Sequence, residues 1–334
     1  MITALNWGIL GTGNIARKFA RDLLAAPEQK LVAVGSRSRE PAKQFGAEFK
    51  IPEAGCHGSY QELLADPAVQ IVYISLPNHL HKEWGIKCAQ AGKHILCEKP
   101  LTVNRREADE FLDVVKAQDV FMMEAFVYRC HPQAFKLREL IREGAIGEVR
   151  MIHGHFNYNM GQNYKNIRMS NPMAGGGILD VGCYPISLAR WAVGCDPVES
   201  KAVAKIGLVS RVDELAAIAL YFPTGAVAAI TCATQVAVEN TVTIFGSEGS
   251  LHLPYPWFSP VREGRLVLKN KNGVNEIKSD AGGLPLYAIE AVHVAEHIAA
   301  RQAPAMPWAD SIGNMATLDA VRRSIGLVFD CERA

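Results

Sequence analysis

A short turn near the start of the chain carries the residues that most clearly indicate chemistry. An apolar run over residues 5–10 ends in Gly11-x-Gly13-x-x-Ala16, and the spacing of later apolar residues predicts a helix directly after it. Gly11 lets the chain reverse direction, and Gly13 has no Cβ to keep a pyrophosphate away from the backbone. The first N–H groups of the helix attract the same anion. The turn therefore predicts a dinucleotide site formed by Gly11, Thr12, Gly13, Asn14 and Ile15.

The next apolar run, residues 31–35, ends in Ser36 and Arg37. At this position of a dinucleotide site, an acidic side chain binds the ribose 2′-hydroxyl group, whereas arginine accommodates a 2′-phosphate. No acidic residue occurs between this run and Glu40. We therefore expect NADP(H) to be the preferred cofactor, with NAD(H) as the alternative.

Lys99 follows a predicted strand at residues 94–97, within Glu98-Lys99-Pro100. Transfer of a hydride from an alcohol requires that the hydroxyl proton be removed, and the reverse reaction requires its return. An amine does this well only when burial or a nearby cation lowers its pKa from about 10.4. The end of a buried strand supplies dry surroundings, and Glu98 need not oppose the change, because consecutive side chains of an extended chain point apart. Most lysines in turns face solvent, however, so the residue types alone leave both interpretations open.

The predicted elements explain how these residues could come together. Up to about residue 124, strands alternate with helices of about 10–15 residues, which predicts a parallel, right-handed, doubly wound sheet. Ligands of such sheets bind outside the carboxyl ends of the strands. Gly11, Ser36, Pro77 and Lys99 all follow predicted strands at those ends.

The second half of the chain has a different pattern. Short strands are predicted at residues 148–157, 200–208, 214–222, 226–234, 240–246 and 249–253, in a mainly antiparallel sheet. Helices are predicted at residues 132–143, 180–193, 284–301 and 310–328. We expect an α/β protein with a dinucleotide-binding domain at residues 1–125 and an α+β domain for substrate binding and dimerisation at residues 126–334. The last helix of the second domain can pack back on the first.

The composition excludes several classes of protein. Of 334 residues, 49% are hydrophobic and 21% are charged, and the formal net charge of +1 gives no basic surface for nucleic acid. No apolar run approaches the length of a membrane span, and no charged and apolar leader is recognised. The eight cysteines are scattered, mostly in apolar segments. We therefore expect reduced thiols and a cytoplasmic protein without nucleic-acid or membrane partners.

The histidines do not match a known metal-binding spacing. His293 and His297 are four residues apart with Glu296 between them, which is not the H-E-x-x-H pattern. The pairs His79 with His81 and His153 with His155 are too sparse for a zinc site. We expect no metal.

Four segments of the chain resemble the glucose–fructose oxidoreductase/inositol dehydrogenase family. They are Gly11-x-Gly13-x-x-Ala16, Pro77-Asn78-x-x-His81, Ala91-Gly92-Lys93-His94-Ile95-Leu96-Cys97-Glu98-Lys99-Pro100 and Gly175-Gly176-Gly177-Ile178-Leu179-Asp180-Val181-Gly182. The third segment is the specific one, and the match covers nearly the whole chain. Glu124-Ala125-Phe126…Arg129 and Asp180-Val181-Gly182-Cys183-Tyr184 are most similar to the branch of dimeric dihydrodiol dehydrogenases and NADP-dependent xylose dehydrogenases.

The resemblance implies a Rossmann domain, an open-faced β-sheet domain and a substrate site between them. It implies that Lys99 is catalytic. Asp180 and Tyr184 are four residues apart on a predicted helix and so share one face, and we expect them to act with Lys99. The commoner family pattern has histidine where Tyr184 stands, so either Tyr184 or Lys99 can be the proton carrier.

Further site residues follow from the same resemblance. The cofactor site is expected to include Leu76, Pro77, Asn78, His81, Glu98 and Lys99. The walls of the substrate pocket are expected to include Phe126, Tyr128, Arg129, Phe156, Tyr158 and Trp257.

Together these features predict an NADP-dependent oxidoreductase acting on a hydroxyl or carbonyl group of a sugar, cyclic polyol or trans-dihydrodiol. One alternative is a cofactor-sensing binding protein without catalysis, which the set of Lys99, Asp180 and Tyr184 argues against. Another is an NAD-dependent glycosidase of the same broad family, which Ser36 and Arg37 argue against. The apolar segments 214–222 and 226–234 predict an open sheet face that is buried in a homodimer or a dimer of dimers.

Overall fold

The computed structural model describes residues 3–259 and 263–333, which divide into two compact units. Unit 1 contains the residues up to Thr102, then Arg106–Cys130 and Gly283–Ser311. Unit 2 contains Val103–Arg105, His131–Gly282 and the residues from Ile312. The segment Gly283–Ser311 thus belongs to unit 1, whereas a single division at residue 126 assigns it to the second domain.

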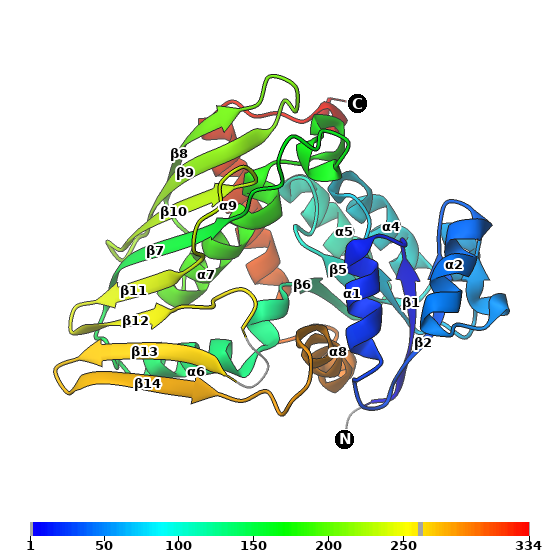
Figure 1. Cartoon of the computed structure of the whole chain (residues 1–334), viewed down its shortest axis with the longest axis horizontal. Helices are drawn as coiled ribbons and strands as arrows, with labels where there is room; N and C mark the ends of the chain where they lie inside the picture. Colours follow the sequence, from blue (N-terminus) through cyan, green and yellow to red (C-terminus); the bar gives the residue numbers. More distant parts are fainter. Residues whose placement is uncertain (1–2, 260–262, 334) are drawn as a thin grey trace. The chain divides into compact units, whose positions relative to one another are not determined.

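A parallel sheet forms the centre of unit 1 (Figure 1). Among the described residues it has six strands in the order β3-β2-β1-β4-β5-β6, and each neighbouring pair is parallel. The strands are β1 (Leu5–Leu10), β2 (Gln29–Gly35), β3 (Cys56–His57), β4 (Ile71–Ile74), β5 (His94–Glu98) and β6 (Met122–Ala125). The helices are α1 (Asn14–Leu23), α2 (Arg39–Phe49), α3 (Tyr60–Ala65), α4 (His81–Gln90), α5 (Arg105–Ala117) and α8 (Leu286–His297). This order is that of doubly wound dinucleotide-binding sheets and confirms the predicted class.

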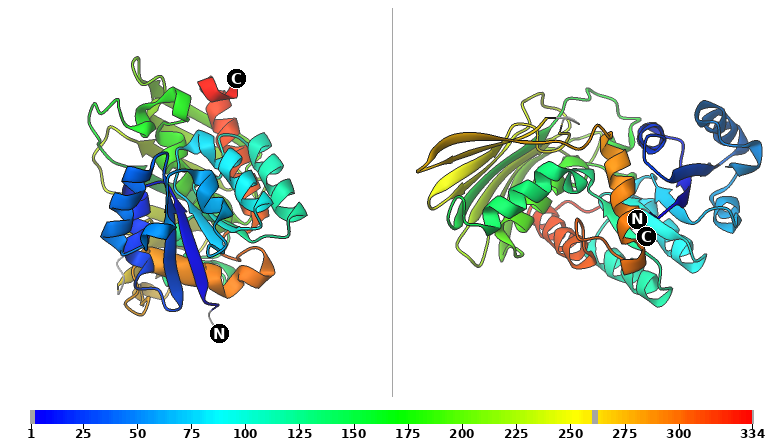
Figure 2. Two further views of the ribbon diagram at one scale, coloured as in Figure 1. Left: turned by 90° about the vertical axis from the view of Figure 1, so that its right-hand side faces the viewer. Right: turned by 90° about the horizontal axis from the view of Figure 1, so that it is seen from below.

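Amphipathic helices bury the strands of this sheet. α1 turns Ala16, Phe19, Ala20 and Leu23 inward, and all four are fully buried. All four residues of β4 are buried, as expected of a parallel strand that is covered on both faces. α8 packs against α1 (Figure 2). The rings of Phe19 and Tyr287 meet edge to face between these two helices.

Unit 2 contains a large mixed sheet. Its strands, within the described residues, follow the order β14-β13-β12-β11-β7-β10-β9-β8, and only the β7–β10 pair is parallel. The strands are β7 (Val149–Asn157), β8 (Glu199–Ile206), β9 (Asp213–Tyr221), β10 (Val227–Ala233), β11 (Val242–Gly246), β12 (Gly249–Leu253), β13 (Gly264–Asn270) and β14 (Gly273–Ser279). α6 (Pro132–Arg142) packs on β13 and β14, and α7 (Cys183–Val193) packs on β7 and β10. The second domain is therefore the predicted α+β type with a large, mainly antiparallel sheet.

Two features of unit 2 differ from the prediction. The hairpin of β13 and β14 was not predicted, because its polar residues, such as Lys269, Asn275 and Lys278, obscure the alternation. The helix predicted at residues 180–193 begins instead as a π-helix, Ile178–Gly182, which continues into α7. α9 (Trp308–Ser324) closes the chain, and the boundary between the units falls within it.

Most of the cysteines are enclosed by other side chains. Cys56, Cys88, Cys97, Cys130, Cys183 and Cys232 are buried, as predicted for most of the cysteines. None of the helices in the described part of the chain has both the length and the hydropathy required to cross a membrane.

Candidate active site

The glycine turn of unit 1 has one crowded side and one open side. Gly11 has φ +102°, and a Cβ there would lie 3.1 Å from Ser75 Oγ, so a larger residue would be both strained and crowded. Gly13 is the N-cap of α1, and a Cβ built on it would have no atom within 4 Å. No side chain caps α1. Its first N–H groups can therefore bind an anion that approaches over Gly13, together with the neighbouring Thr12, Asn14 and Ile15.

The turn after β2 presents a positive charge. Ser36 is buried and its N–H donates to the His57 carbonyl oxygen at 3.2 Å, whereas Arg37 is exposed. α2 begins directly afterwards, with Ser38 as an N-cap that makes no side-chain capping hydrogen bond. The Arg37 charge acts to lower the pKa of Tyr60, against the larger effect of burial, which raises it. The guanidinium and the start of α2 thus offer positive charge at one corner of the sheet edge.

His81 connects two loops at the carboxyl ends of β4 and β5. It is fully buried, and its Nε2 and Nδ1 lie 2.8 Å and 2.9 Å from the carbonyl oxygens of Leu76 and Pro100. Burial lowers the pKa of His81, and the two backbone hydrogen bonds act in the opposite direction. Because its ring is enclosed by protein, His81 holds the Leu76–Pro77–Asn78 loop and the Lys99 loop at a fixed spacing.

Lys99 directly follows β5 and is half-buried. The preceding carboxylate of Glu98 accepts a hydrogen bond from the Tyr73 hydroxyl group and one of 3.3 Å from the Lys99 backbone N–H. Tyr73 is itself fully buried and stacks on Phe19, with ring centroids 3.9 Å apart. The Glu98 carboxylate thus ties the end of β5 to the buried ring of Tyr73.

The segment after β6 is buried within unit 1. Arg129 is fully buried, with its guanidinium 2.5 Å from Asp310 and its Nε–H donating to the Tyr128 hydroxyl oxygen at 3.1 Å. Phe126 and Tyr128 are only 1% and 3% exposed, and their rings pack edge to face. The contacts of Arg129 are those of an internal ion pair, and its role in substrate binding stays a prediction.

Glu124, within β6 just before this segment, is also fully buried. Burial raises the pKa of Glu124 to about 7, although its carboxylate accepts a 2.8 Å hydrogen bond from the Leu101 N–H. That bond joins the end of β6 to the residue after Pro100. It anchors Leu101 after the Lys99 loop, as His81 anchors Pro100.

In unit 2, Asp180 is the centre of a polar cluster. It lies on the π-helix and is 9% exposed. Its Oδ2 accepts a hydrogen bond of 2.5 Å from the Tyr158 hydroxyl group and one of 3.0 Å from the Arg168 Nε–H. Burial, followed by the Asp180 charge, raises the pKa of Tyr158. π-helical turns are common at functional sites, and this one aims a carboxylate at a tyrosine and an arginine.

Tyr184 belongs to an adjoining aromatic cluster. It lies in the first turn of α7, and its ring centroid is 5.1 Å from that of Phe156 and 5.7 Å from that of Trp257. Phe156 and Trp257 stack with centroids 5.6 Å apart, and Trp257 Nε1 donates to the His155 carbonyl oxygen at 2.8 Å. The predicted substrate residues of unit 2 thus form two clusters. Asp180 and Tyr158 belong to the polar cluster, and Phe156, Tyr184 and Trp257 belong to the aromatic cluster.

Two residues of unit 2 were not predicted. Arg168 lies on a 3-10 helix of three residues, Ile167–Met169, which is too short to give a periodic signal in the sequence. Asp213, at the start of β9, is fully buried and accepts a 2.6 Å hydrogen bond from the Ile178 N–H. A Cβ on Gly176 would lie 2.2 Å from Asp213 Oδ1, and one on Gly175 would lie 2.5 Å from the Arg168 carbonyl oxygen. These glycines therefore make room for the chain itself.

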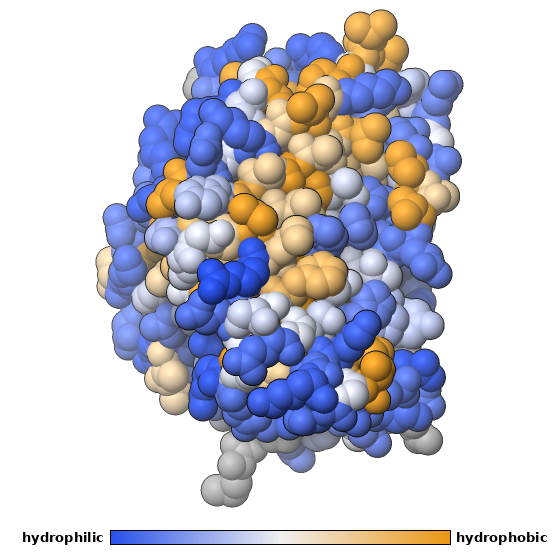
Figure 3. Space-filling view, turned by 90° about the vertical axis from the view of Figure 1, so that its left-hand side faces the viewer, coloured by the Kyte–Doolittle hydropathy of each residue, from blue (hydrophilic) through white to orange (hydrophobic). Residues whose placement is uncertain are grey.

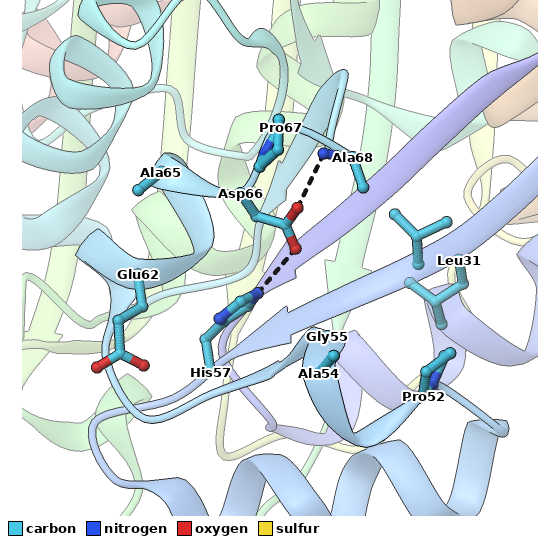
Figure 4. Close-up of a pocket in the computed structure, with 11 residues that line it drawn as sticks. Leu31, Pro52, Ala54, Gly55, His57, Glu62, Ala65, Asp66, Pro67 and Ala68 are labelled. Atoms are coloured by element: carbon cyan, nitrogen blue, oxygen red, sulfur yellow. Dashed lines mark hydrogen bonds and ion pairs between the residues drawn. The ribbon is translucent and has the colours of Figure 1, made fainter.

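A separate cavity of about 620 Å³ opens beside β2 and β3 (Figure 4). Most of its walls are apolar, and His57 and Asp66 form a 3.0 Å ion pair at its rim. It contains none of the predicted site residues. We therefore assign it no part in the candidate active site.

A doubly wound sheet with an open glycine turn, joined to a unit with a large mixed sheet, defines a two-unit oxidoreductase of the dinucleotide-binding class. Residues 5–126 match the oxidoreductase family with an NAD-binding Rossmann fold, and residues 135–252 match the GFO/IDH/MocA C-terminal domain. The chain belongs to the GFO/IDH/MocA oxidoreductase family, which confirms the resemblance recognised in its motifs.

Relatives of known identity extend this comparison. The trans-1,2-dihydrobenzene-1,2-diol dehydrogenase of Bos taurus is 32% identical over 342 residues, covering 98% of each chain. KijD10, a 3-ketoreductase from Actinomadura kijaniata solved with NADP and TDP-benzene, is 27% identical, with a TM-score of 0.86 and coverage of 96% and 98%. Levoglucosan dehydrogenase, solved with NADH and levoglucosan, is 25% identical, with a TM-score of 0.85 and coverage of 96% and 97%. Other solved structures of KijD10 carry a lysine-to-alanine or a tyrosine-to-phenylalanine replacement.

Proposed function

We propose that this protein transfers a hydride between NADP(H) and a hydroxyl or carbonyl group of a sugar, cyclic polyol or trans-dihydrodiol. The observation that carries the proposal is the surroundings of Lys99. It follows a buried strand at the carboxyl edge of the sheet, and hydrogen bonds to Tyr73, His81 and Glu124 hold the neighbouring residues 98, 100 and 101. A lysine held this way is suited to proton transfer.

The residues of unit 1 fit a dinucleotide. The open side of Gly13 and the uncapped start of α1 suit the pyrophosphate, and the exposed Arg37 suits a 2′-phosphate. When bound, NADP(H) would donate or accept the hydride. The presence of NADP in the KijD10 structure supports this choice, whereas NADH in levoglucosan dehydrogenase keeps NAD(H) as the alternative.

In this proposal, Tyr184 and Lys99 act on the same substrate oxygen, and one of them transfers its proton. In the favoured scheme the Tyr184 hydroxyl gives or takes the proton, and the ammonium group of Lys99 stabilises the phenolate by its charge. In the other scheme Lys99 transfers the proton, and Tyr184 only binds the oxygen. Asp180, held by Tyr158 and Arg168, orients the substrate or one of these two residues.

Kinetics of two variants test the proposal with a panel of sugars, cyclic polyols and dihydrodiols. Tyr184→Phe keeps the ring that packs on Phe156 and Trp257 and removes only the hydroxyl group. If Tyr184 carries the proton, kcat should fall by roughly 10²–10⁴-fold; if it only binds, KM should rise instead. Lys99→Ala should lower kcat severely in both schemes, whereas NADPH should still bind.

Exposed residues of the same types supply the controls. Tyr221→Phe and Lys116→Ala should leave kcat and KM unchanged, because both side chains are exposed, on β9 and α5. A Lys99→Ala enzyme with near-normal kcat would contradict the proposal. A protein that binds NADPH but oxidises or reduces no substrate in the panel would instead support a cofactor-sensing role, and glycoside cleavage with retained NAD would support the glycosidase alternative.

A further inference from the structure

The C-terminal turn of α8 brings three metal-binding side chains together. The ligand atoms of His293, Glu296 and His297 all lie within 4.8 Å of one another. The two imidazole rings have centroids 4.3 Å apart and planes inclined by 40°. Positions i, i+3 and i+4 share one face of a helix, so a single ion could contact all three side chains.

The hydrogen bonding of His297 prepares it to bind a metal. Its Nδ1 lies 2.8 Å from the carbonyl oxygen of His293. A carbonyl can only accept, so Nδ1 carries the proton and Nε2 keeps its lone pair. Metal-ligating histidines commonly donate their second N–H group in this way, which fixes the tautomer and the direction of the ring.

The surroundings of the cluster also favour a cation. α8 ends at His297, and the carbonyl groups of a final helical turn carry partial negative charge. Glu296 is exposed and adds a full negative charge, whereas His293 is only 8% exposed.

We propose that His293, Glu296 and His297 form a binding site for one divalent transition-metal ion of the Zn²⁺ type at the end of α8. Two imidazole nitrogens and one carboxylate oxygen form a donor set that Zn²⁺ accepts, and water completes a four-coordinate ion. The order H-x-x-E-H is the reverse of the H-E-x-x-H signature, which is why the sequence argument expected no metal here. The bound ion pins the last turn of a helix that packs against α1, so it stabilises unit 1 without a part in hydride transfer.

Calorimetric titration of tag-free full-length protein with ZnCl₂ tests the site. We expect one ion per chain and a rise in Tm with zinc that EDTA reverses. His297→Gln should weaken zinc binding by more than about tenfold, since even second-shell changes at metal sites cost that much. Glu296→Gln should weaken it as well, whereas His153→Gln, at an exposed histidine on β7, should not.

The half-buried Cys195 and Cys331 could also bind zinc, so the titration is repeated after Cys195→Ser and Cys331→Ser. Co²⁺ in place of Zn²⁺ should give the spectrum of tetrahedral nitrogen and oxygen ligation without thiolate charge transfer. Circular dichroism and NADPH binding verify that each variant is folded. Absence of stoichiometric binding, or binding that survives His297→Gln or is lost with the cysteines, would overturn the proposal.

Discussion

The arginine side chains differ in what their charge can reach. The guanidinium of Arg129 is completely buried and is committed to Asp310 and Tyr128 within unit 1. That of Arg168 binds Asp180 in unit 2. Arg37 is exposed at the corner where α2 begins, so its charge can meet a phosphate that arrives from solution. At the residue scale, surroundings decide which arginine is structural and which is available to a ligand.

Replacement of Arg37 tests the proposed cofactor preference. Arg37→Ala should weaken NADP binding by about 1.5–3 kcal/mol, the range for a lost hydrogen bond to a charged group. This corresponds to roughly 10–150-fold in Kd. NAD binding should barely change, because NAD has no 2′-phosphate, and Arg106→Ala on the exposed side of α5 should affect neither cofactor. Equal losses for both cofactors in calorimetry would contradict the assignment.

The π-helix depends on one buried carboxylate at its start. Asp213 reaches from β9 to the Ile178 N–H, where it takes the place of a side-chain cap. Burial raises the pKa of Asp213 to about 7, while the backbone N–H groups of Ile178 and Gly177 lower it. Gly176 adopts φ +104° against this carboxylate. At the element scale, a glycine and an aspartate that are distant in sequence together set where Asp180 points.

Gly176→Ala should therefore destabilise the protein strongly. The new Cβ would lie 2.2 Å from Asp213 Oδ1 in a left-handed conformation, and both effects oppose folding. We expect a loss of at least about 2 kcal/mol in the free energy of unfolding, measured with urea. Gly225→Ala is the matched control, because φ is +83° there and no atom lies within 4 Å of its Cβ. It should cost only about 1–2 kcal/mol, the strain of a left-handed residue; equal losses would argue against the Asp213 contact.

The outer face of the unit 2 sheet exposes a hydrophobic surface. The register aligns Val227 with Tyr221, and Ala229 with Ala219, across β10 and β9. Val203 on β8 is 79% exposed, and Tyr221 and Val227 are 47% and 42% exposed. Figure 3 shows hydrophobic residues gathered over part of the molecular surface. At the scale of the whole molecule, such a surface supports the proposal that two copies pair through it, as a homodimer or within a dimer of dimers.

A charge placed within this surface should separate the copies. Ala219 is exposed on β9, next to Ala229 of β10, and Ala219→Lys would bury an ammonium group in the proposed interface. Light scattering at micromolar concentration should show a dimer or tetramer for the unmodified protein and a monomer for the variant. Leu24→Lys, at a 62% exposed residue of unit 1, should leave the oligomeric state of the protein unchanged. A monomer before any substitution would refute the proposal.

Local sequence determined the parallel sheet, its ligand-binding edge and the family. Strands such as Ile71–Ile74 are continuous apolar runs, and the glycine turn and Glu98-Lys99-Pro100 are contiguous motifs. The turns of the β9–β10 and β11–β12 hairpins, Pro223-Thr224-Gly225 and residues 246–249, are likewise contiguous, because turn chemistry is local too. Each of these features is written within a few neighbouring residues, so periodicity and spacing are sufficient to read it.

Only the tertiary structure decided which side chains meet. Arg129 and Asp310 are 181 residues apart, and Ile178 and Asp213 are 35 apart. Asp180 finds Tyr158 on another element, and His81 finds the carbonyl oxygen of Pro100 across two strand ends. Such pairs leave no periodic signal, because their geometry arises only when separate elements pack and exclude water. The family and the place of Lys99 could therefore be read from the chain, whereas the partners that orient Asp180 and enclose Arg129 required the fold.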